Sequence, residues 1–529
     1  MSRTRSTWNA DLAAAVSGPG GALEWLIEPV IALGSSTGGP SGLYVAGAVY
    51  GTARIPGVRP TMVPRSVNVG PSSVSPVSWR ANEGSWSFRI ADRDRATLAQ
   101  AFRRGSWYRL RVGLDGMAVA AYSPVALGRV AGVTESATGE ITVTMWGPGA
   151  SLGSRPDTIS VRSSIHPTIT ATTVSGGAYT AGDAAINLAS VSDVAGRTGG
   201  YLMLYVEPTA GTPFYIRGTG ITASTVDGLD AAGSFGTTAA SAPNGSSVTP
   251  IWYDEGNPWS LLLRILTSTG QGANGGNDTL PDRWGYGLPV DVIDFPGIEG
   301  HGRELFSPSS GLFSLRLGVL SPPENPGAWL VSWMSRIGAW LCTREGSITL
   351  RAAQDITSRG SIDRHTGIVI TDADIIPGRS TVEWFAGDQP TEYLRARVLS
   401  ASGSTQSSAA ATAGTLPNRG SVVEYDLSTV LWDNETATRS DVVGRLAPWV
   451  KSVGETVQVT CRGMGMARRC PGDVVDIRSS DLRGRLARTV VGYGAGIPAM
   501  ITAVAPNWSQ GTTQLRAIVL PADRNDEWS

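Results

Sequence analysis

The sequence predicts a mainly β protein of several domains with a few helices, a β/α+β fold class. Of its 529 residues, 66 are Gly and 32 are Pro, more than a helical bundle tolerates, because both residues interrupt regular elements. Only 16% of the residues are charged and 17 are Trp, a composition unlike that of disordered chains. Segments in which apolar and polar residues alternate recur along the chain and predict strands.

The first section, to about residue 155, predicts a compact β domain. A short helix is expected from Asp92, as N-cap, to Gly105, because Leu98 and Phe102 lie one helical turn apart between them. The helix falls between the first two of three strands with period-two alternation: Trp86–Ile90, Tyr108–Val112 and Ile141–Met145.

The second section, about 160–249, changes in composition to Ser, Thr, Ala and Gly with few charges. Such low complexity is also compatible with a linker. Short runs of β-type residues between turn signals instead favour a small inserted β module. These runs are Ile186–Leu188, Tyr201–Val206 and Phe214–Arg217.

The third section, about 250–400, contains the clearest helices. Asn257 and Pro258 begin one whose apolar residues fall on a single face, and Asn325 and Pro326 begin a second that ends near Gly338. A strand over 348–351 follows the second helix. The Ser-, Ala- and Thr-rich stretch 401–414 is predicted to be a linker or an exposed loop.

The last section, from about 415, begins with a helical period over 442–453 that Pro448 must kink or break. Strand signals then continue almost to the end of the sequence. The predicted strands are Val457–Cys461, Val474–Ile477, Met500–Val504 and Leu515–Leu520.

Charge and targeting signals narrow the function classes. The 43 basic and 44 acidic residues give a net charge of −1, which provides no overall attraction to nucleic acid or an anionic membrane. No window approaches 18 uninterrupted apolar residues, so no membrane span is expected. The first apolar stretch is broken by Asp11 and is too short for a signal peptide, so we expect synthesis in the cytoplasm and a soluble chain.

Cysteine and histidine spacing predicts neither a disulfide framework nor a metal site. Cys461 and Cys470 could meet across a hairpin, but free thiols are favoured for these residues and for Cys342 in a reducing cell. The three histidines are far apart and lack the spacing of metal ligands: His166, His301 and His365.

Two short motifs resemble catalytic or phosphate-binding sequences but lack the required context. Residues 34–38 match the letters of a nucleophile elbow, but Gly39 and Pro40 follow directly where a helix is needed. Residues 463–466 begin like a phosphate loop, but Arg468 replaces its third glycine. We interpret both segments as loops.

Candidate acid–base residues are also better explained by ordinary structural roles. Glycosidic chemistry needs two carboxylates at a defined separation, whereas Asp372 with Asp374 and Asp473 with Asp476 read as exposed turn residues. His301 lies between two glycines and could act as a loop base, but no nucleophile or orienting acid is evident nearby.

Tryptophans and arginines offer two further candidate surfaces. Eight Trp residues could include a sugar-stacking platform, although filling the core is favoured: Trp25, Trp79, Trp86, Trp107, Trp146, Trp252, Trp259 and Trp284. The arginine clusters are Arg103–Arg104, Arg468–Arg469 and the looser Arg483, Arg485 and Arg488, which we interpret as loop ends or subunit contacts. We therefore assign no catalytic, cofactor-binding or metal-binding residues, and no cofactor or enzymatic activity is expected.

Segments at both ends of the chain resemble a known family. The "Pro-Gly-Asp-Val-Val" turn and strand within 470–477, the return strand 500–504, Asn507-Trp508 and the final strand 515–521 resemble the C-terminal domain of bacteriophage tail hub and tip proteins. The segment 187–248 resembles a small β module inserted in phage tail proteins. The layout of Trp86–Ile90, Gly128–Val130 and Ile141–Trp146 is similar to the first tube-like domain of such hubs.

This resemblance, which covers about half of the chain, implies a domain plan. It comprises an N-terminal tube-like hub domain (1–158), an inserted small β module (159–249), an α+β middle domain (250–400), a linker or exposed loop (401–414) and a C-terminal β-barrel-like hub domain (415–529). The chain departs from those hubs that carry a lysozyme or peptidase domain, because no such domain is visible.

The same resemblance implies a structural role in the virion. The expected protein is a homotrimeric baseplate hub, assembled in the host cytoplasm, that joins the tail tube and the distal tail protein to the central fibre or spike. Two tube-like domains per subunit would match the sixfold tube, and phage DNA would pass transiently through the lumen. Two alternatives stay open: a receptor-binding tail adhesin, from the Ser/Thr/Gly-rich stretches, and a cell-envelope glycan hydrolase, from the Trp content.

Overall fold

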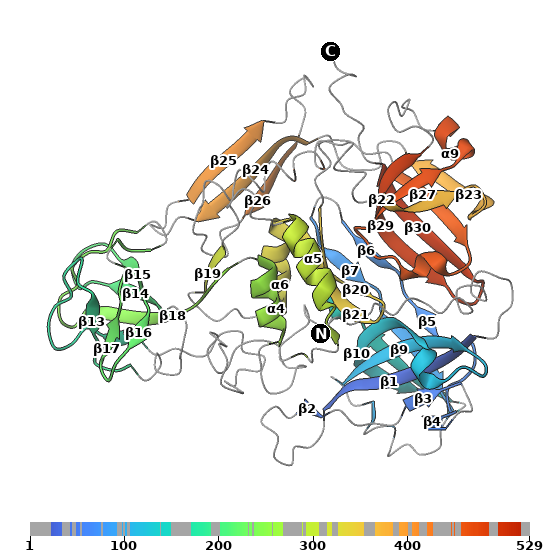
Figure 1. The fold of residues 1–529 in the computed structure, drawn as a ribbon, viewed down its shortest axis with the longest axis horizontal. Helices are drawn as coiled ribbons and strands as arrows, with labels where there is room; N and C mark the ends of the chain where they lie inside the picture. Colours follow the sequence, from blue (N-terminus) through green and yellow to red (C-terminus); the bar gives the residue numbers. More distant parts are fainter. Residues whose placement is uncertain are drawn as a thin grey trace.

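The computed structural model describes residues 23–519 with gaps, the longest being 150–170, 268–287, 354–365 and 427–445. Strands dominate, and they form two large sheets, a small β module and a separate three-stranded sheet around central helices (Figure 1). The predicted fold class, mainly β with a few helices in several units, is confirmed. The predicted domain boundaries remain predictions.

The N-terminal sheet has nine strands and forms where the sequence alternates. Phe88, Leu110 and Val143 are fully buried on one face of its predicted strands. The strand over 23–33, which was not predicted, has no alternation because it is buried on both faces: Trp25 and Ile27 enter one core and Leu26 another. The strands are β1 (Leu23–Leu33), β2 (Leu43–Tyr44), β3 (Val49–Gly51), β4 (Val58–Arg59), β5 (Asn68–Val69), β8 (Trp86–Ile90), β9 (Trp107–Leu114), β10 (Ser123–Glu135) and β11 (Ile141–Trp146).

The predicted short helix over 92–105 lies mostly outside the described residues. One turn of it is visible, because the Phe102 N–H donates to the Leu98 carbonyl at 2.8 Å. Both side chains are buried in the core of the N-terminal sheet. Phe102 contacts the rings of Tyr50, Phe88 and Tyr108 there.

The C-terminal sheet has eight strands and contains every strand predicted after residue 455. Its edges, 366–371 and 375–383, are joined by the short turn 372–374, so the sheet curls until its two ends approach each other. No ladder joins these edges among the described residues, so the predicted barrel is not closed. The strands are β6 (Ser72–Val74), β7 (Ala81–Glu83), β22 (Thr366–Thr371), β23 (Ile375–Glu383), β27 (Thr456–Arg462), β28 (Val474–Arg478), β29 (Ile497–Asn507) and β30 (Thr512–Val519).

One hairpin crosses from the N-terminal part of the sequence into the C-terminal sheet. β6 pairs with β7 and also with β29, where Ser73 lies opposite Ala503. The N-terminal part of the chain therefore contributes two strands to the C-terminal sheet and is hydrogen-bonded into it. The two large sheets lie one above the other on the same side of the molecule (Figure 1).

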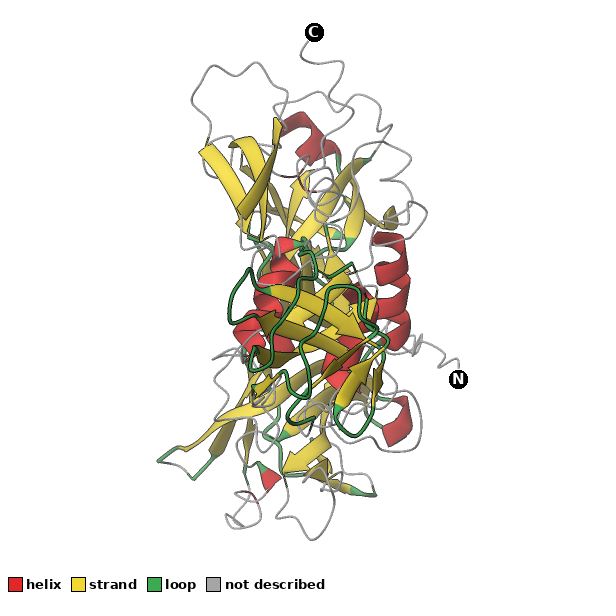
Figure 2. Ribbon diagram, turned by 90° about the vertical axis from the view of Figure 1, so that its left-hand side faces the viewer, coloured by secondary structure: helices red, strands yellow, loops and turns green. Residues whose placement is uncertain are grey.

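The central region contains the two predicted helices and one that the sequence analysis missed. Pro258 opens the first helix as expected, and Leu262 and Leu266 are buried on its inner face. Figure 2 shows these helices at mid-height, with strand-rich regions above and below them. The elements are α4 (Pro258–Thr267), α5 (Phe295–Leu305), α6 (Pro326–Arg336) and the hairpin β20 (Ala339–Arg344) with β21 (Ser347–Ala352).

The small β module has its own hydrophobic core, drawn from residues 174–248. Its three predicted strands are present, and its longest strand continues outward to pair with a strand near residue 317. The strands are β12 (Thr172–Thr173), β13 (Ala185–Asn187), β14 (Leu202–Glu207), β15 (Phe214–Gly218), β16 (Gly220–Ile221), β17 (Thr225–Asp227), β18 (Ser247–Gly256) and β19 (Leu315–Val319).

The stretch 401–414 was predicted to be a linker or an exposed loop, but part of it is a strand. It contains β25 (Thr405–Ala411), which pairs with β24 (Thr391–Leu399), and β24 also pairs with β26 (Ser421–Asp426). The prediction failed because Ser and Ala have weak strand preference, and backbone pairing to a neighbouring strand overrides it. Of the predicted helix over 442–453, Leu446 and Trp449 are helical, and the remainder lies outside the described residues.

Candidate functional site

Three segments distant in the sequence meet at the centre of the molecule. We call this place the junction: the hairpin β6–β7, the hairpin β20–β21 and the loop 470–473. Its core joins Trp107 of the N-terminal sheet, Trp333 of α6 and Val474 of the C-terminal sheet in one continuous apolar cluster. The junction therefore locks the two large sheets and the central helices together.

Three indole rings form the apolar half of the junction. Trp79 stacks on Trp340 with ring centroids 5.7 Å apart and meets Trp449 edge to face at 5.8 Å. Trp79 is fully buried although its φ is +52°, a left-handed conformation that is unfavourable for a bulky residue. Its packing must offset this backbone strain.

A buried ion pair forms the polar half. The Arg351 guanidinium on β21 is 1% exposed and lies 3.1 Å from a carboxylate oxygen of Asp473. Burial acts to lower the pKa of Arg351, but the charges of Cys470 and Asp473 outweigh it and raise the pKa. Burial acts in turn to raise the pKa of Asp473, but Arg351 and Arg344 hold it below its usual value. Each group therefore keeps its partner ionised.

The Glu83 carboxylate, at the end of β7, links β7 to Gly149 and to β20 by hydrogen bonds. Its carboxylate accepts hydrogen bonds from the Gly149 N–H, at 2.8 Å, and from the Thr343 N–H of β20. Burial raises the pKa of Glu83, although these two hydrogen bonds act in the opposite direction. The carboxylate thus serves as a structural acceptor for two backbone groups.

The three cysteines are free, as favoured from the sequence, and all three are buried. Cys461 lies in the core of the C-terminal sheet, away from Cys470, and burial raises its pKa to about 12. Cys470 instead belongs, together with Cys342 of β20, to the core of the junction. Cys461 and Cys470 thus lie in different cores, because Cys461 is on strand β27 of the C-terminal sheet, whereas Cys470 belongs to the junction loop.

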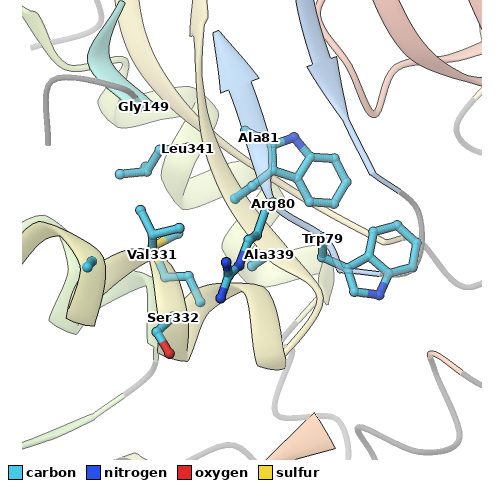
Figure 3. A pocket seen from close by; sticks show the side chains of 11 residues that line it. Trp79, Arg80, Ala81, Gly149, Val331, Ser332, Ala339 and Leu341 are labelled. Carbon is cyan, nitrogen blue, oxygen red and sulfur yellow. The ribbon is translucent and has the colours of Figure 1, made fainter. Parts of the chain in front are cut away.

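A pocket of about 230 Å³ opens beside the junction, between α6 and β20 (Figure 3). Arg80 extends across it toward α6. Its lining, all within the described part of the chain, contains one guanidinium and one hydroxyl but no carboxylate, imidazole or thiol: Trp79, Arg80, Ala81, Gly149, Ala328, Val331, Ser332, Met334, Ala339, Trp340 and Leu341. These groups can hold an apolar group beside an anion, but they provide no acid–base pair.

The acidic pairs have structural partners. Asp374 accepts hydrogen bonds from the N–H and hydroxyl of Thr371, both at 2.8 Å, in the turn that links β22 and β23. Asp372 accepts from the Ser480 N–H and hydroxyl, and hydrogen bonds from Ser479 and Ser480 lower its pKa. The two residues thus close a turn, as interpreted from the sequence.

The second acidic pair is divided between two roles. Asp473 belongs to the buried ion pair of the junction, contrary to its interpretation as an exposed turn residue. Asp476 on β28 is 3.0 Å from Arg478. A carboxylate in the Pro-Gly turn would be exposed in isolation, but the hairpin β20–β21 covers this one.

His301 lies on α5, not in a loop. The helix forms despite its glycines because the Asp294 carboxylate accepts the Gly297 N–H at its start, at 3.0 Å, and because Gly302 lets the backbone approach Trp259 of α4. His166, His365 and the elbow-like segment 34–38 lie outside the described residues.

The remaining candidates are largely structural. Residues 465–468 form a single 3-10 turn, and Arg468 pairs with Glu345 at 3.0 Å. Arg103, Arg104 and Arg488 lie outside the described residues. Of the eight tryptophans considered for stacking, four are buried in the core: Trp25, Trp79, Trp86 and Trp107.

Sequence reasoning missed the junction as a site. Arg351 gave no signal, because its strand is buried throughout and shows no alternation. Glu83, Cys342 and Asp473 come from three separate segments, so no local spacing links them. Within the described ranges, no group of three or more His, Cys, Asp or Glu residues is placed to hold a metal ion, and no helix there is long and apolar enough to cross a membrane.

Comparisons with known proteins gave likenesses among solved structures. No family model and no curated protein matches the chain. The tail protein of prophage MuSo2 from Shewanella oneidensis is 10% identical over 94% of this chain and 98% of its own, with a TM-score of 0.33. A tail protein from Neisseria meningitidis is 10% identical over 86% and 96%, with a TM-score of 0.32.

A prophage tail protein from Listeria monocytogenes is 8% identical over 96% of this chain and 95% of its own, with a TM-score of 0.33. The superposition of the whole chain is weak in all three cases.

Proposed function

We propose that this chain is a structural protein of a phage tail, and within the tail the baseplate hub that joins the tube and the distal tail protein to the central fibre or spike. The observation that carries the proposal is that the two large β-sheets of one subunit are held together by extensive contacts. A connector between two assemblies must transmit force without separating its own domains, and this union supplies that property.

The union rests on three kinds of contact. β6 of the N-terminal part is hydrogen-bonded to β29 of the C-terminal sheet. Trp25 of β1 meets Trp508 edge to face at 4.9 Å, and Met464 enters the core of the N-terminal sheet. Backbone pairing, aromatic contact and shared apolar burial would all have to break before the sheets separate.

The C-terminal motif that carried the sequence resemblance forms one continuous structure. Pro471 and Gly472 make a tight turn in which Gly472 has a φ of +101°, a conformation that favours glycine. The strand that follows, β28, pairs with β29, and β29 pairs with β30. This arrangement supports the tube-like character proposed for the C-terminal domain.

In the proposed assembly, three copies of the chain form a ring. Each copy contributes its nine-stranded and its eight-stranded sheet, so six sheet-based domains surround the lumen and match the sixfold tube. Closed cyclic symmetry of this kind requires complementary heterologous surfaces on each subunit. The genome would pass through the lumen.

The test combines mass and location. Light scattering of the full chain after size-exclusion chromatography should give three times the 55.2 kDa chain mass, and a co-purified ring protein should add its own mass to this value. Gold-labelled antibody against the chain should mark the tail tip in electron micrographs of phage particles that contain it. Label at a single central position at the tip supports the hub.

Two other results would replace the proposal. Label on lateral fibres, together with binding of the isolated chain to host cells, would identify an adhesin. Clearing of host peptidoglycan in a zymogram would identify a glycan hydrolase if a variant outside the junction abolishes the clearing and no variant of the junction does. A stable monomer with no label at the tip would also refute the hub.

A further inference from the structure

One face of helix α6 forms a wall of the pocket beside the junction. Ala328, Val331 and Ser332 lie three and four residues apart, a spacing that places them on the same side of the helix. Ala328 is exposed and the other two are half-buried, so these residues form the rim. Trp340 and Leu341 of β20 are buried and form the floor. The pocket therefore has an apolar interior with a rim that solvent reaches.

Arg80 supplies the single charge of this lining, all of whose residues the structure describes. Its side chain extends across the pocket toward α6, where Ser332 provides a hydroxyl (Figure 3). Arg80 is exposed, and within the described ranges its guanidinium makes no hydrogen bond or ion pair. The Glu83 carboxylate lies behind Gly149 and accepts hydrogen bonds from backbone N–H groups. The pocket thus presents a cation that the described residues do not neutralise.

The backbone that carries Arg80 is held in place. The Ser75 N–H donates to the Arg80 carbonyl at 3.2 Å, and the Trp79 N–H donates to the Ser75 carbonyl at 2.7 Å. The buried indole of Trp79, stacked on Trp340, fixes the same turn from the inside. The base of the Arg80 side chain is therefore positioned before a ligand binds, which lowers the entropic cost of binding.

The size of the pocket limits the ligand. A closed apolar cavity of about 150 Å³ binds benzene. The pocket between α6 and β20 has a volume of about 230 Å³, which leaves room for one such ring and a short arm that carries a polar group.

The polar groups of the lining favour a carboxylate on that arm. A guanidinium binds a carboxylate through two parallel hydrogen bonds, and the Ser332 hydroxyl is a further donor. A phosphate dianion has three oxygens and two charges to satisfy, which one guanidinium and one hydroxyl do not provide. The donor set therefore suits a singly charged, planar anion.

We infer that this pocket binds small carboxylates that carry an aromatic ring, with the carboxylate at Arg80 and the ring between α6 and β20. Because Arg80 is exposed, water competes for its charge, so apolar burial provides most of the affinity and the ion pair a smaller share. Arg80 belongs to the hairpin β6–β7, whereas the rest of the wall belongs to the central region, so the ligand would bridge two parts of the junction. This inference goes beyond the proposed function and does not depend on it.

The experiment is a ligand-observed NMR titration of the full chain with phenylpropionate. A ligand of this size should bind with a dissociation constant of about 0.1–1 mM. Phenylpropanamide has the same shape without the charge and should bind about three- to tenfold more weakly. Propionate lacks the ring and should show no measurable binding. Absence of phenylpropionate binding, or equal affinities for the acid and the amide, overturns the inference.

Three variants test the location of the ligand. Arg80→Gln should weaken phenylpropionate about three- to tenfold and leave the affinity for phenylpropanamide unchanged. Arg462→Gln, which removes an exposed arginine of β27 outside the lining, is the matched control and should change neither affinity. Ala328→Phe places a ring at the exposed rim and should abolish measurable binding of both ligands.

Two results with these variants would contradict the assignment. Equal losses for the acid and the amide in Arg80→Gln would overturn the role of Arg80 as the anion-binding group. Full affinity in Ala328→Phe would overturn the place of the ligand between α6 and β20. The comparison of acid with amide in the unchanged chain remains decisive if a variant fails to fold.

Discussion

Trp79 allows a direct measurement of backbone strain at the junction. Its φ of +52° places a bulky residue in the left-handed region, which costs about 1 kcal/mol or more for a residue with a Cβ. The fully buried indole, packed on Trp340 and Trp449, offsets this cost. Removing the indole without relieving the strain should therefore be worse than removing both the indole and the Cβ.

The expected magnitudes follow from these contacts. Trp79→Ala should lower the free energy of unfolding by about 5 kcal/mol, the upper end for a buried aromatic, because two ring contacts are lost with the apolar burial. Trp79→Gly loses the same contacts but relieves the left-handed strain, so it should be about 1 kcal/mol more stable than Trp79→Ala. This order is the reverse of the usual one for Ala and Gly.

The assay is urea unfolding followed by circular dichroism, with the midpoint difference multiplied by the mean denaturant slope. The matched control is Trp333, which is 1% exposed and lies within helix α6. There, Trp333→Gly should be about 1 kcal/mol less stable than Trp333→Ala, because glycine is the poorer helix former. If Trp79→Ala equals or exceeds Trp79→Gly in stability, the strain argument is wrong.

Three further predictions concern the helices and the buried charges. Gly302→Ala should cost about 1–3 kcal/mol in unfolding free energy, because its Cβ would overlap Trp259. Gly300→Ala has open space around it and should stabilise the same helix by up to about 1 kcal/mol. Equal effects of the two variants in urea unfolding would contradict the close approach of Gly302 to Trp259. Arg351→Met should cost about 3–5 kcal/mol by leaving a buried carboxylate unpaired, and a loss below 1 kcal/mol would show that the pair is solvated. The raised pKa of Glu83 means that, above about pH 4.5, this group binds more protons in the folded chain than in the unfolded chain. Its contribution to stability is therefore greatest at low pH and falls as pH rises through this window. Glu83→Gln should remove this part of the pH dependence, up to about 1.4 kcal/mol of unfolding free energy per pH unit, and parallel profiles of the variant and the unchanged chain would refute this.

Local patterns in the sequence predicted much of the fold. Trp86–Ile90 and Ile141–Met145 alternate because one face of each strand packs on a core and the other does not. Pro258 and Pro326 mark helix starts because a proline at the first helical position loses no hydrogen bond. Signals of this kind depend only on neighbours in the chain, so they can be recognised in the sequence without knowledge of the tertiary structure.

The junction could not be predicted in the same way. Arg351 is charged in a strand that is buried throughout, and only Asp473, on another segment, makes that burial tolerable. Cys461 and Cys470 are near in sequence, but Cys470 shares the core of the junction with Cys342, and Cys461 lies in the core of the C-terminal sheet. Such contacts depend on which segments meet in the folded chain, and residue spacing within one segment cannot predict which segments meet.

The pairing of β6 with β29 also constrains the order in which the chain can fold during synthesis. Ser73 meets its partner Ala503 only after about 430 further residues have been made, roughly 20 to 90 seconds at ordinary translation rates. Through that interval the strand at 72–74 has an open edge, and an open edge is a site for wrong pairing between nascent chains. Its Ser-Ser-Val sequence is short and polar, which limits that hazard, and the final locking of the two sheets becomes one of the last events before the chain is ready to assemble.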